Sequence, residues 1–229
     1  MDTKDSQSEN VTSLVDVWTT LSANGIALSK QQMDDLERYH NELRYWNERV
    51  NMISRKDMES IWERHIVHSL CLLKYVSFKT KARVLDVGTG GGLPGIPLKI
   101  ARPDLRVVLV DSIAKKMKIV RMFAQHTDLK NIGTLTARVE DLANDAHYRR
   151  AFDVIVSRAV APVSKLIEWT RPLLAPGGFF VFLKGGDLSE EIGAAQQLFP
   201  DLKVTVKDIE LFGLPQFKMD EKKVVVCEY

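Results

Sequence analysis

The sequence lacks several features that would assign it to a class of protein at once. Its 229 residues include two cysteines, Cys71 and Cys227, and they do not form a CxxC pair. Two distant cysteines exclude a disulfide-rich scaffold and favour a reducing compartment. No apolar run approaches the roughly 20 residues that a membrane-spanning helix needs, and no basic and apolar leader precedes the polar start. We therefore expect a cytoplasmic protein without membrane contact.

The sequence also lacks a strong net charge. It has 32 Lys and Arg against 30 Asp and Glu, a formal net charge of +2. A contact with nucleic acid would therefore depend on a local patch rather than on a basic field over the whole molecule. With 45% hydrophobic residues, the chain can bury one substantial core.

A set of metal ligands is missing as well. His65 and His68 stand three residues apart, but no Cys or third His stands near them at ligand spacing, so we expect no metal. Trp18, Trp46 and Trp62 follow apolar helical patterns and are expected to pack in the core rather than to stack on bases.

The first third of the chain has the pattern of helices. Apolar residues recur at helical spacing from Val11 to Leu21, and Gly25 then ends the run. Ser29 and Gln32 form a capping-box signal for a second helix. A third helix is expected to carry the apolar residues between Ile61 and Val76. We interpret residues 1–78 as a helical region packed on a core formed by residues 79–229, with both in one compact domain.

From Arg83 onward, short apolar strands alternate with helical stretches. This alternation predicts a parallel sheet covered on both faces. The last two apolar runs have no helical pattern between them, so we expect an antiparallel pair joined without a helix. The expected strands are 83–88, 106–111, about 132–137, 152–157, 178–184, 203–212 and 222–228.

A glycine-rich turn follows the first of these strands. The apolar run ends in Asp86, and glycine occupies positions 88, 90 and 92. Glycine lets backbone N–H groups approach a ligand without interference from a Cβ atom. Pro94 and Pro97 fit the start of a following helix, where their missing donors cost little. The turn therefore predicts a site for a small nucleotide-like ligand.

Two ligands and one structural alternative fit this turn. Gly90, Gly92 and Gly95 match the GxGxxG pattern of dinucleotide sites, with Asp111 about 20 residues further on. S-adenosylmethionine fits better, because Asp86 would repel a pyrophosphate but can orient a methionyl ammonium or a water, while Asp111 can accept both ribose hydroxyls. In the structural alternative, the glycines only make a turn and both acids are solvated.

The segment Arg138-Val139-Glu140-Asp141 follows the third expected strand. A backbone N–H beside Glu140 is then placed to read the adenine of an adenosyl ligand. The alternative is a plain helix start that favours acidic residues.

The chain resembles a known family at several separated motifs. This resemblance covers residues 30 to 229 and identifies the chain as similar to the glucose-inhibited division protein B family, also called RsmG. The motifs are Asn51-Met52-Ile53-Ser54, Arg64-His65, Asp86 to Leu98, Val110-Asp111-Ser112 with Lys115-Lys116, Ser157-Arg158-Ala159 and Lys184-Gly185.

The resemblance implies a fold, a reaction and a partner. The fold would be α/β, a Rossmann-like class I methyltransferase with a mostly parallel sheet, an antiparallel last strand and an N-terminal helical extension. The reaction would move a methyl group from S-adenosylmethionine to N7 of a guanine in small-subunit ribosomal RNA, naked or in a ribosomal particle. A methyltransferase acting on a small molecule or a protein is the alternative.

The resemblance also implies the residues of the site. Cofactor contacts carried over by position fall on Gly88, Leu93, Asp111, Val139, Glu140 and Arg158, and the chemistry of the turn adds Asp86 and Gly90. RNA contacts are expected at Asn51, Arg64, His65, Lys115, Lys116 and Lys184. A charged helix face is otherwise only solvated surface.

One position departs from the family pattern on the third helix. Where the family has Arg-His-x-x-Asp-Ser, this chain has His68 in place of the acid. Lys116 and Lys222-Lys223 also stand where the family often has Arg, which keeps the charge but loses the planar fork of a guanidinium.

The expected chemistry needs no general base, because guanine N7 carries a lone pair and no proton. Positioning of the reacting atoms is then the main catalytic effect. Arg158 is our candidate for orienting the base or the cofactor. In the alternative, Arg158 only pairs with Asp153 or Asp111 and stabilises the fold.

Overall fold

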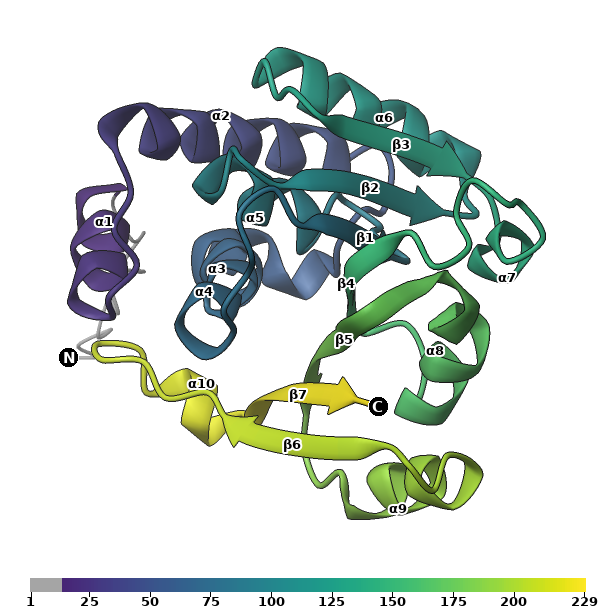
Figure 1. The fold of residues 1–229 in the computed structure, drawn as a ribbon. Coiled ribbons are helices and arrows are strands. Elements are labelled where there is room, and N and C mark those ends of the chain that lie inside the picture. The colour runs from purple at the N-terminus through teal and green to yellow at the C-terminus, as the bar shows by residue number, and fades with distance from the viewer. Residues whose placement is uncertain (1–13) are drawn as a thin grey trace, which may run out of the picture.

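The computed structural model describes residues 14–229, in which a seven-stranded sheet lies between two layers of helices (Figure 1). The strands lie in the order β3-β2-β1-β4-β5-β7-β6. Their bounds are β1 (Arg83–Val87), β2 (Arg106–Asp111), β3 (Ile132–Thr136), β4 (Phe152–Arg158), β5 (Leu174–Gly185), β6 (Lys203–Asp208) and β7 (Lys222–Glu228).

Strand direction changes only at the end of the chain. Strands β1 to β5 pair in parallel, whereas β7 runs antiparallel between β5 and β6. The expected parallel sheet and antiparallel last pair are therefore confirmed. Because β7 is reversed, its first residue, Lys222, pairs with Gly185 at the carboxyl end of β5, and thus lies at the edge where the parallel strands end.

One face of the sheet carries the N-terminal helices. Residues of α2 such as Leu36 belong to the same buried cluster as Val84 of β1 and Leu109 of β2. The helical region and the sheet therefore share one hydrophobic core, which is what a single folding unit requires. The helices with residues in this cluster include α1 (Leu14–Ala23), α2 (Lys30–Asn47), α5 (Gly95–Ala101) and α6 (Ala114–His126).

The opposite face of the sheet packs a second cluster, which includes Leu85, Ile155 and Phe182. Alternate residues of the buried strands thus supply the two cores, as the two-residue period of a strand requires. The helices that pack here are α7 (Val139–Leu142), α8 (Val163–Thr170) and α9 (Ser189–Leu198), and a short 3₁₀ turn, η3 (Arg171–Leu173), precedes β5.

The predicted start of the second helix is confirmed. Ser29 Oγ accepts the Gln32 amide at 3.3 Å, and the Gln32 side chain accepts the Ser29 amide at 2.8 Å. These bonds satisfy amides that have no partner within the helix. The predicted stripe is buried from Met33 to Leu43, while Val11 of the first expected helix lies outside the described residues.

The third expected helix is not continuous. The chain forms a 3₁₀ helix, η1 (Arg55–Ser60), then a π-helix, η2 (Trp62–Val67), and two short helices, α3 (His68–Leu70) and α4 (Leu72–Tyr75). Val76 already has extended backbone angles. Periodicity locates the buried side chains but does not detect the extra residue that widens a π turn.

The expectation of no helix between the last two strands is wrong. A four-residue helix, α10 (Gln216–Met219), follows Pro215. Phe217 is 3% exposed and its ring lies 5.5 Å from that of His68. A single turn is too short to produce a helical pattern in the sequence, so only the tertiary contact shows why it forms.

No helix among residues 14–229 is long and apolar enough to cross a membrane.

Candidate functional site

Two cavities lie along the carboxyl edge of the parallel strands. The larger, of about 500 Å³, is lined by the glycine turn, by η2 and by the ends of β4 and β5. The smaller, of about 250 Å³, lies beside it near α7. Gly88 and Asp111 line both, so the two cavities form one elongated groove that bends at these residues.

The glycine turn brings the backbone to the floor of this groove. Gly88 has φ 66° and Gly90 φ 55°, a left-handed conformation that side chains other than glycine adopt only with strain. A Cβ at Gly88 would overlap the side chain of Val160. The turn therefore requires glycine there for backbone geometry and for space.

Asp86 lies beneath the turn and not in the groove. Its side chain is fully buried, and Oδ2 accepts Thr89 Oγ1 at 2.6 Å and the Gly95 amide at 2.8 Å. Burial raises the pKa of Asp86 to about 7, against the opposing effect of these two hydrogen bonds. Oδ1 is buried without a hydrogen-bond partner among the described residues, so one oxygen fixes the turn and the other remains unsatisfied.

Asp111 ends β2 at the bend of the groove. Its Oδ2 accepts the Gly90 amide at 3.0 Å and its Oδ1 accepts the Ile113 amide at 2.9 Å. Each carboxylate oxygen can accept a second hydrogen bond. The half-buried carboxylate is thus held in place by backbone and can still accept hydroxyl groups of a ligand.

The lining of the smaller cavity suits a flat ring. This lining includes Val139 and Glu140 at the start of α7, together with Val160 and Trp169 on the side of α8. Apolar side chains in the lining suit an aromatic ring, and the start of α7 adds polar groups that can recognise its edge.

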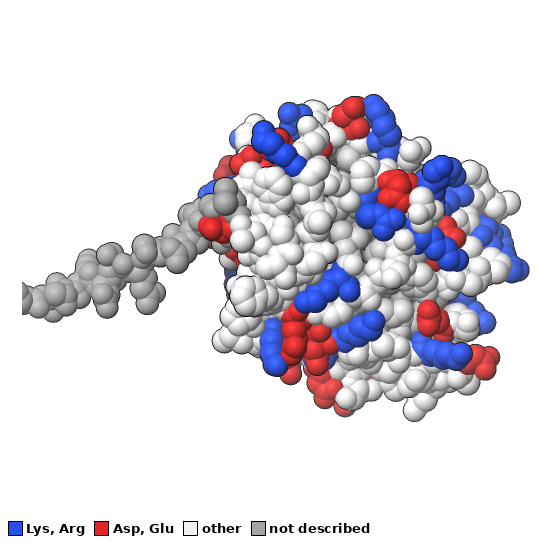
Figure 2. Space-filling view, turned by 60° about the vertical axis from the view of Figure 1, so that its left-hand side comes forward, with Lys and Arg blue, Asp and Glu red and all other residues white. Residues whose placement is uncertain are grey.

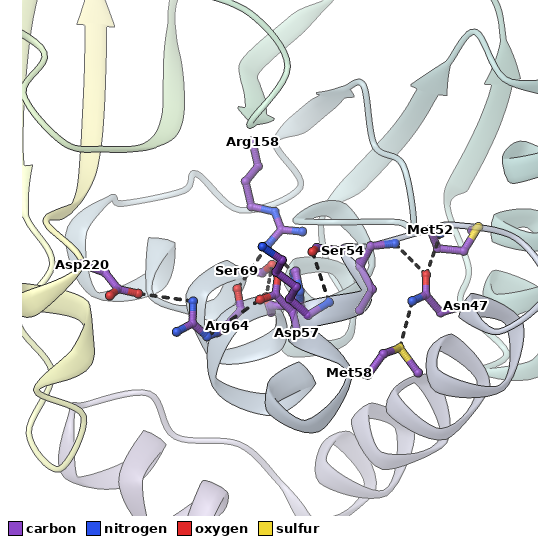
Figure 3. A network of polar contacts seen from close by, with 12 residues as sticks. Asn47, Met52, Ser54, Asp57, Met58, Arg64, Ser69, Arg158 and Asp220 are labelled. Atoms are coloured by element: carbon purple, nitrogen blue, oxygen red, sulfur yellow. Dashed lines mark hydrogen bonds and ion pairs between the residues drawn. The ribbon is translucent and has the colours of Figure 1, made fainter.

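A chain of polar contacts positions Arg158 in the larger cavity (Figure 3). Its Nη1 lies 2.8 Å from His65 Nδ1 and donates to the Arg64 carbonyl at 3.2 Å. Because a guanidinium cannot accept a hydrogen bond, Nδ1 is the unprotonated nitrogen of His65. The protonated Nε2 lies 3.2 Å from Asp57 Oδ2. The contacts of Nη1 leave Nη2 and Nε of Arg158 for a ligand.

Burial and neighbouring cations keep His65 neutral. Desolvation, followed by Arg158 and Arg64, lowers the pKa of His65 to about 3. A neutral His65 can accept from Arg158 at every physiological pH. The expected structural partners of Arg158 have other contacts: Asp153 accepts the Arg83 amide at 2.7 Å, and Asp111 accepts the amides given above.

The π-helix places His65 and His68 on the wall of the same cavity. Asn47 fixes the loop that precedes it, since its Oδ1 accepts the amides of Met52 and Ile53 at 2.7 and 2.8 Å. Both loop residues line the cavity. One buried amide at the end of α2 therefore sets the loop that forms one side of the site.

Cationic side chains surround the opening of the larger cavity. Arg64, Lys116, Lys184 and Lys222 line it with Arg158. Arg64 is 47% exposed and lies 3.5 Å from Asp220. On the face that Figure 2 displays, blue Lys and Arg and red Asp and Glu side chains are interspersed, and neither sign of charge covers this face.

Most of the predicted cofactor residues meet in the groove. Gly88, Gly90, Leu93, Asp111 and Arg158 line the larger cavity, and Val139 and Glu140 line the smaller one. Asp86 lines neither. Its distance from the groove follows from the pleat of β1, which directs this side chain under the turn.

The predicted RNA residues divide into two groups. Arg64, His65, Lys116 and Lys184 line the larger cavity, whereas Asn51 and Lys115 are exposed outside its lining. Lys184 is not a free cation: its Nζ lies 2.6 Å from Glu191 Oε1 and donates to the Ala161 carbonyl, and its side chain is only 11% exposed.

The sequence did not point to several residues of the site. Asp57 and Thr89 line the larger cavity and Trp169 lines the smaller one, and Lys222, which the sequence marked only as a replacement for an Arg of the family, also lines the larger cavity. Asp57 follows an Asn-Met-Ile-Ser motif that does mark the loop, but its contact with His65 depends on the π turn. Lys222 reaches the site only because β7 is antiparallel.

Comparison with known proteins identifies the family. The profile described as rRNA small subunit methyltransferase G matches residues 32–219. Ribosomal RNA small subunit methyltransferase G of Desulfitobacterium hafniense (strain Y51) is 42% identical over 189 residues, which cover 82% of this chain and 78% of that protein.

The chain belongs to the rRNA small subunit methyltransferase G family. The protein of the same name from Cytophaga hutchinsonii (strain ATCC 33406) is 39% identical over 204 residues, covering 86% of this chain and 93% of that one. Membership in this family decides against the dinucleotide alternative for the glycine turn.

Solved structures show the fold of this family member. Fibrillarin of Aeropyrum pernix, solved with S-adenosyl-L-methionine natively bound, has a TM-score of 0.54 and 15% identity over 72% of this chain and 75% of that one. A ribosomal protein L11 methylase from Lactobacillus delbrueckii subsp. bulgaricus has a TM-score of 0.53 and 18% identity, covering 70% and 76%. The fold is that of class I methyltransferases.

The groove fits S-adenosylmethionine, the methyl donor of these enzymes. A Cβ at Gly88 would overlap Val160, which lines the smaller cavity, and the apolar side chains of Val160 and Trp169 there suit an adenine ring. The buried, unpartnered Asp86 Oδ1 supplies a negative potential under the turn when ionised. Among residues 14–229, no group of three or more His, Cys, Asp or Glu is arranged to hold a metal ion.

Proposed function

We propose that this protein transfers the methyl group of S-adenosylmethionine to N7 of a guanine in small-subunit ribosomal RNA. One observation carries the proposal: the glycine turn and the cationic rim of Arg64, Lys116 and Lys222 line a single cavity. A site for a methyl donor thereby opens toward groups that attract phosphates. The family to which the chain belongs supports RNA as the methyl acceptor.

Bound S-adenosylmethionine would supply an electrophilic methyl group on a sulfonium, which N7 takes with its lone pair while the carbon–sulfur bond breaks and the ring becomes cationic. No proton leaves the base, so the chain need not provide a general base. Asp111, which lines both cavities, would accept ribose hydroxyls, and Val139 and Trp169 in the smaller cavity would hold the adenine. Arg158, fixed by His65, orients the reacting groups.

The remaining residues position the RNA. Arg64 and Lys116 at the cavity, with Asn51 and Lys115 outside it, would bind phosphates near the target nucleotide. Lys184 would instead support the wall of the site through Glu191. A protein with this substrate works where ribosomes assemble, and we place it in the cytoplasm.

The decisive experiment combines the purified protein with methyl-labelled S-adenosylmethionine and small ribosomal subunits, naked small-subunit RNA, or a protein extract freed of RNA. Label should enter only RNA, and nuclease digestion followed by mass spectrometry should identify 7-methylguanosine. Label in protein or small molecules, with none in RNA, would favour the alternative substrate and contradict the proposal.

A further inference from the structure

His68 lines the larger cavity but takes no part in the network that holds Arg158. Its side chain is buried, with 6% of the residue exposed. Its Nε2 has no hydrogen-bond partner among residues 14–229. A buried polar atom without a partner costs free energy, and such atoms in native proteins mark a missing ligand or water more often than a defect.

The ring of His68 has a defined tautomer. The backbone carbonyl of Arg64 accepts a hydrogen bond from this ring, and since Nε2 is the nitrogen without a partner, the donor is Nδ1. A neutral imidazole protonated on Nδ1 presents Nε2 as an acceptor. Burial lowers the pKa of His68 well below its usual value, and Arg158 and Lys222 lower it further.

Phe217 packs against the ring of His68, and the cationic neighbours of this ring are hydrogen-bond donors. Arg158 and Lys222 are the two cations that act most strongly on the ring, and both line the same cavity. On this part of the wall His68 Nε2 is thus an acceptor beside two groups that can only donate, whereas the carboxylates of Asp57 and Asp111 are already in contact with His65 and with backbone amides. A base that fits this arrangement needs an acceptor for the cations and, next to it, a donor for His68.

Guanine offers that complement on the edge next to N7. Its O6 accepts hydrogen bonds, and the adjacent N1–H donates one. Adenine has the reverse pattern, with a donor at N6 and an acceptor at N1. A base that faces the cations with O6 and His68 with N1–H therefore satisfies every group if it is guanine, and none if it is adenine.

We propose that His68 Nε2 accepts a hydrogen bond from N1–H of the target guanine and thereby selects this base. The proposal rests on the proposed function, whose acceptor base it specifies further. The bond also favours the reaction itself. As positive charge develops on the ring, N1–H becomes a stronger donor, so the bond to His68 is stronger in the transition state than in the bound substrate.

The test compares His68→Leu, which removes the acceptor, with His68→Gln, whose Oε1 restores an acceptor near the position of Nε2. Methylation of small-subunit RNA by His68→Leu should fall about 10- to 100-fold in kcat/KM, with part of the decrease in kcat. His68→Gln should recover at least a part of this activity. His147→Leu removes an exposed imidazole far from the cavity and should match the unchanged protein.

Calorimetry with S-adenosylmethionine separates folding and cofactor binding from base recognition. The affinity of His68→Leu should stay within about threefold of the unchanged protein, because His68 faces the base and not the cofactor. A large decrease in affinity would assign His68 to the cofactor side and overturn the proposal.

Modified RNA provides a second test of the proposal once the position of the methylated guanine is known. Inosine at that position keeps O6 and N1–H and should be methylated, while 1-methylguanine should lower the rate of the unchanged protein far more than that of His68→Ala. Equal effects on the two proteins would overturn the proposal. If the unchanged protein methylates no RNA at all, the proposed function fails first.

Discussion

At the scale of single residues, the site depends on buried polar groups whose partners fix their chemistry. Asp57 faces Nε2 of His65, so that its Nδ1 is free to accept from Arg158. The guanidinium of Arg158 is thereby held by a neutral imidazole and not by a carboxylate. Arg158 thus keeps its charge and its remaining donors for the groove.

Replacing Arg158 by Ala separates a catalytic from a structural role. Turnover on RNA should fall about 10²- to 10³-fold, as for other donors aimed at a reacting group. The melting temperature should change by only about 2 °C, since the fold does not rest on this side chain. The matched control is Arg106→Ala, at the exposed start of β2, which should leave turnover unchanged. A large drop in melting temperature with normal turnover would favour the structural role.

Asp86 should make stability depend on pH. Its pKa is raised by burial to about 7 in the folded protein, above the ordinary value of an unfolded chain. At a pH between these two pKa values, the protein takes up a proton on folding. The stability that neutral Asp86 contributes is therefore present at low pH and is lost as the pH rises toward 7.

The measurement is the free energy of unfolding of the unchanged protein and of Asp86→Asn at pH 4.5 and pH 8. Relative to the variant, the unchanged protein should lose about 2–4 kcal/mol over this interval. A difference that is constant with pH would show that Asp86 is ionised in the folded protein throughout.

At the scale of elements, the turn between β1 and α5 was predictable in detail and the segment between α2 and β1 was not. Glycines and prolines restrict the backbone locally, so Gly88 and Pro94 identify the turn by themselves. The contacts of Asp57, His65 and Arg158 depend on a π turn and on a strand some 90 residues away in sequence, and no short pattern encodes them.

Gly88→Asp tests the turn. The new Cβ would overlap the side chain of Val160 and strain a left-handed residue, so binding of S-adenosylmethionine measured by calorimetry should be abolished while the circular dichroism of the helices persists. Gly177→Asp is the control, because Gly177 also has a positive φ but has open space around it. Binding that survives in Gly88→Asp would remove the turn from the cofactor site.

The start of α6 should act through RNA phosphates. Replacing Lys115 and Lys116 by Ala should weaken binding of small-subunit RNA and reduce the slope of log affinity against log salt by about one for each phosphate that the protein no longer binds. Lys165→Ala on α8, away from the groove, should leave the slope unchanged. An unaltered slope in the double variant would show that these lysines are only solvated.

At the scale of the whole molecule, the helical region and the sheet share one hydrophobic core, from which we expect them to unfold together. Apolar periodicity predicted both parts and the direction of the strands, because buried faces dominate the pattern of a sequence. It did not predict that Lys222 reaches the site, since this needs the order of all seven strands.

Leu36→Ala tests whether the helical region and the sheet unfold together. Leu36 of α2 is fully buried in the cluster shared with β1 and β2, and its truncation should cost about 2–5 kcal/mol. Denaturant unfolding followed by far-ultraviolet circular dichroism and by tryptophan fluorescence should show one coincident transition. Glu37→Ala, on the exposed face of the same helix, should be nearly neutral. Two separate transitions would indicate independent domains.

The widened turn of η2 also limits how sequences of this kind can vary. Each residue of a regular helix turns the chain by about 100° about the helix axis. Deleting one residue between Trp62 and Val67 would therefore rotate the side chains that precede the deletion relative to those that follow it. Arg64 and His65 would then point away from the side to which His68 points. A substitution along this stretch changes one contact of the site, whereas a change in the length of the stretch displaces several of them at once.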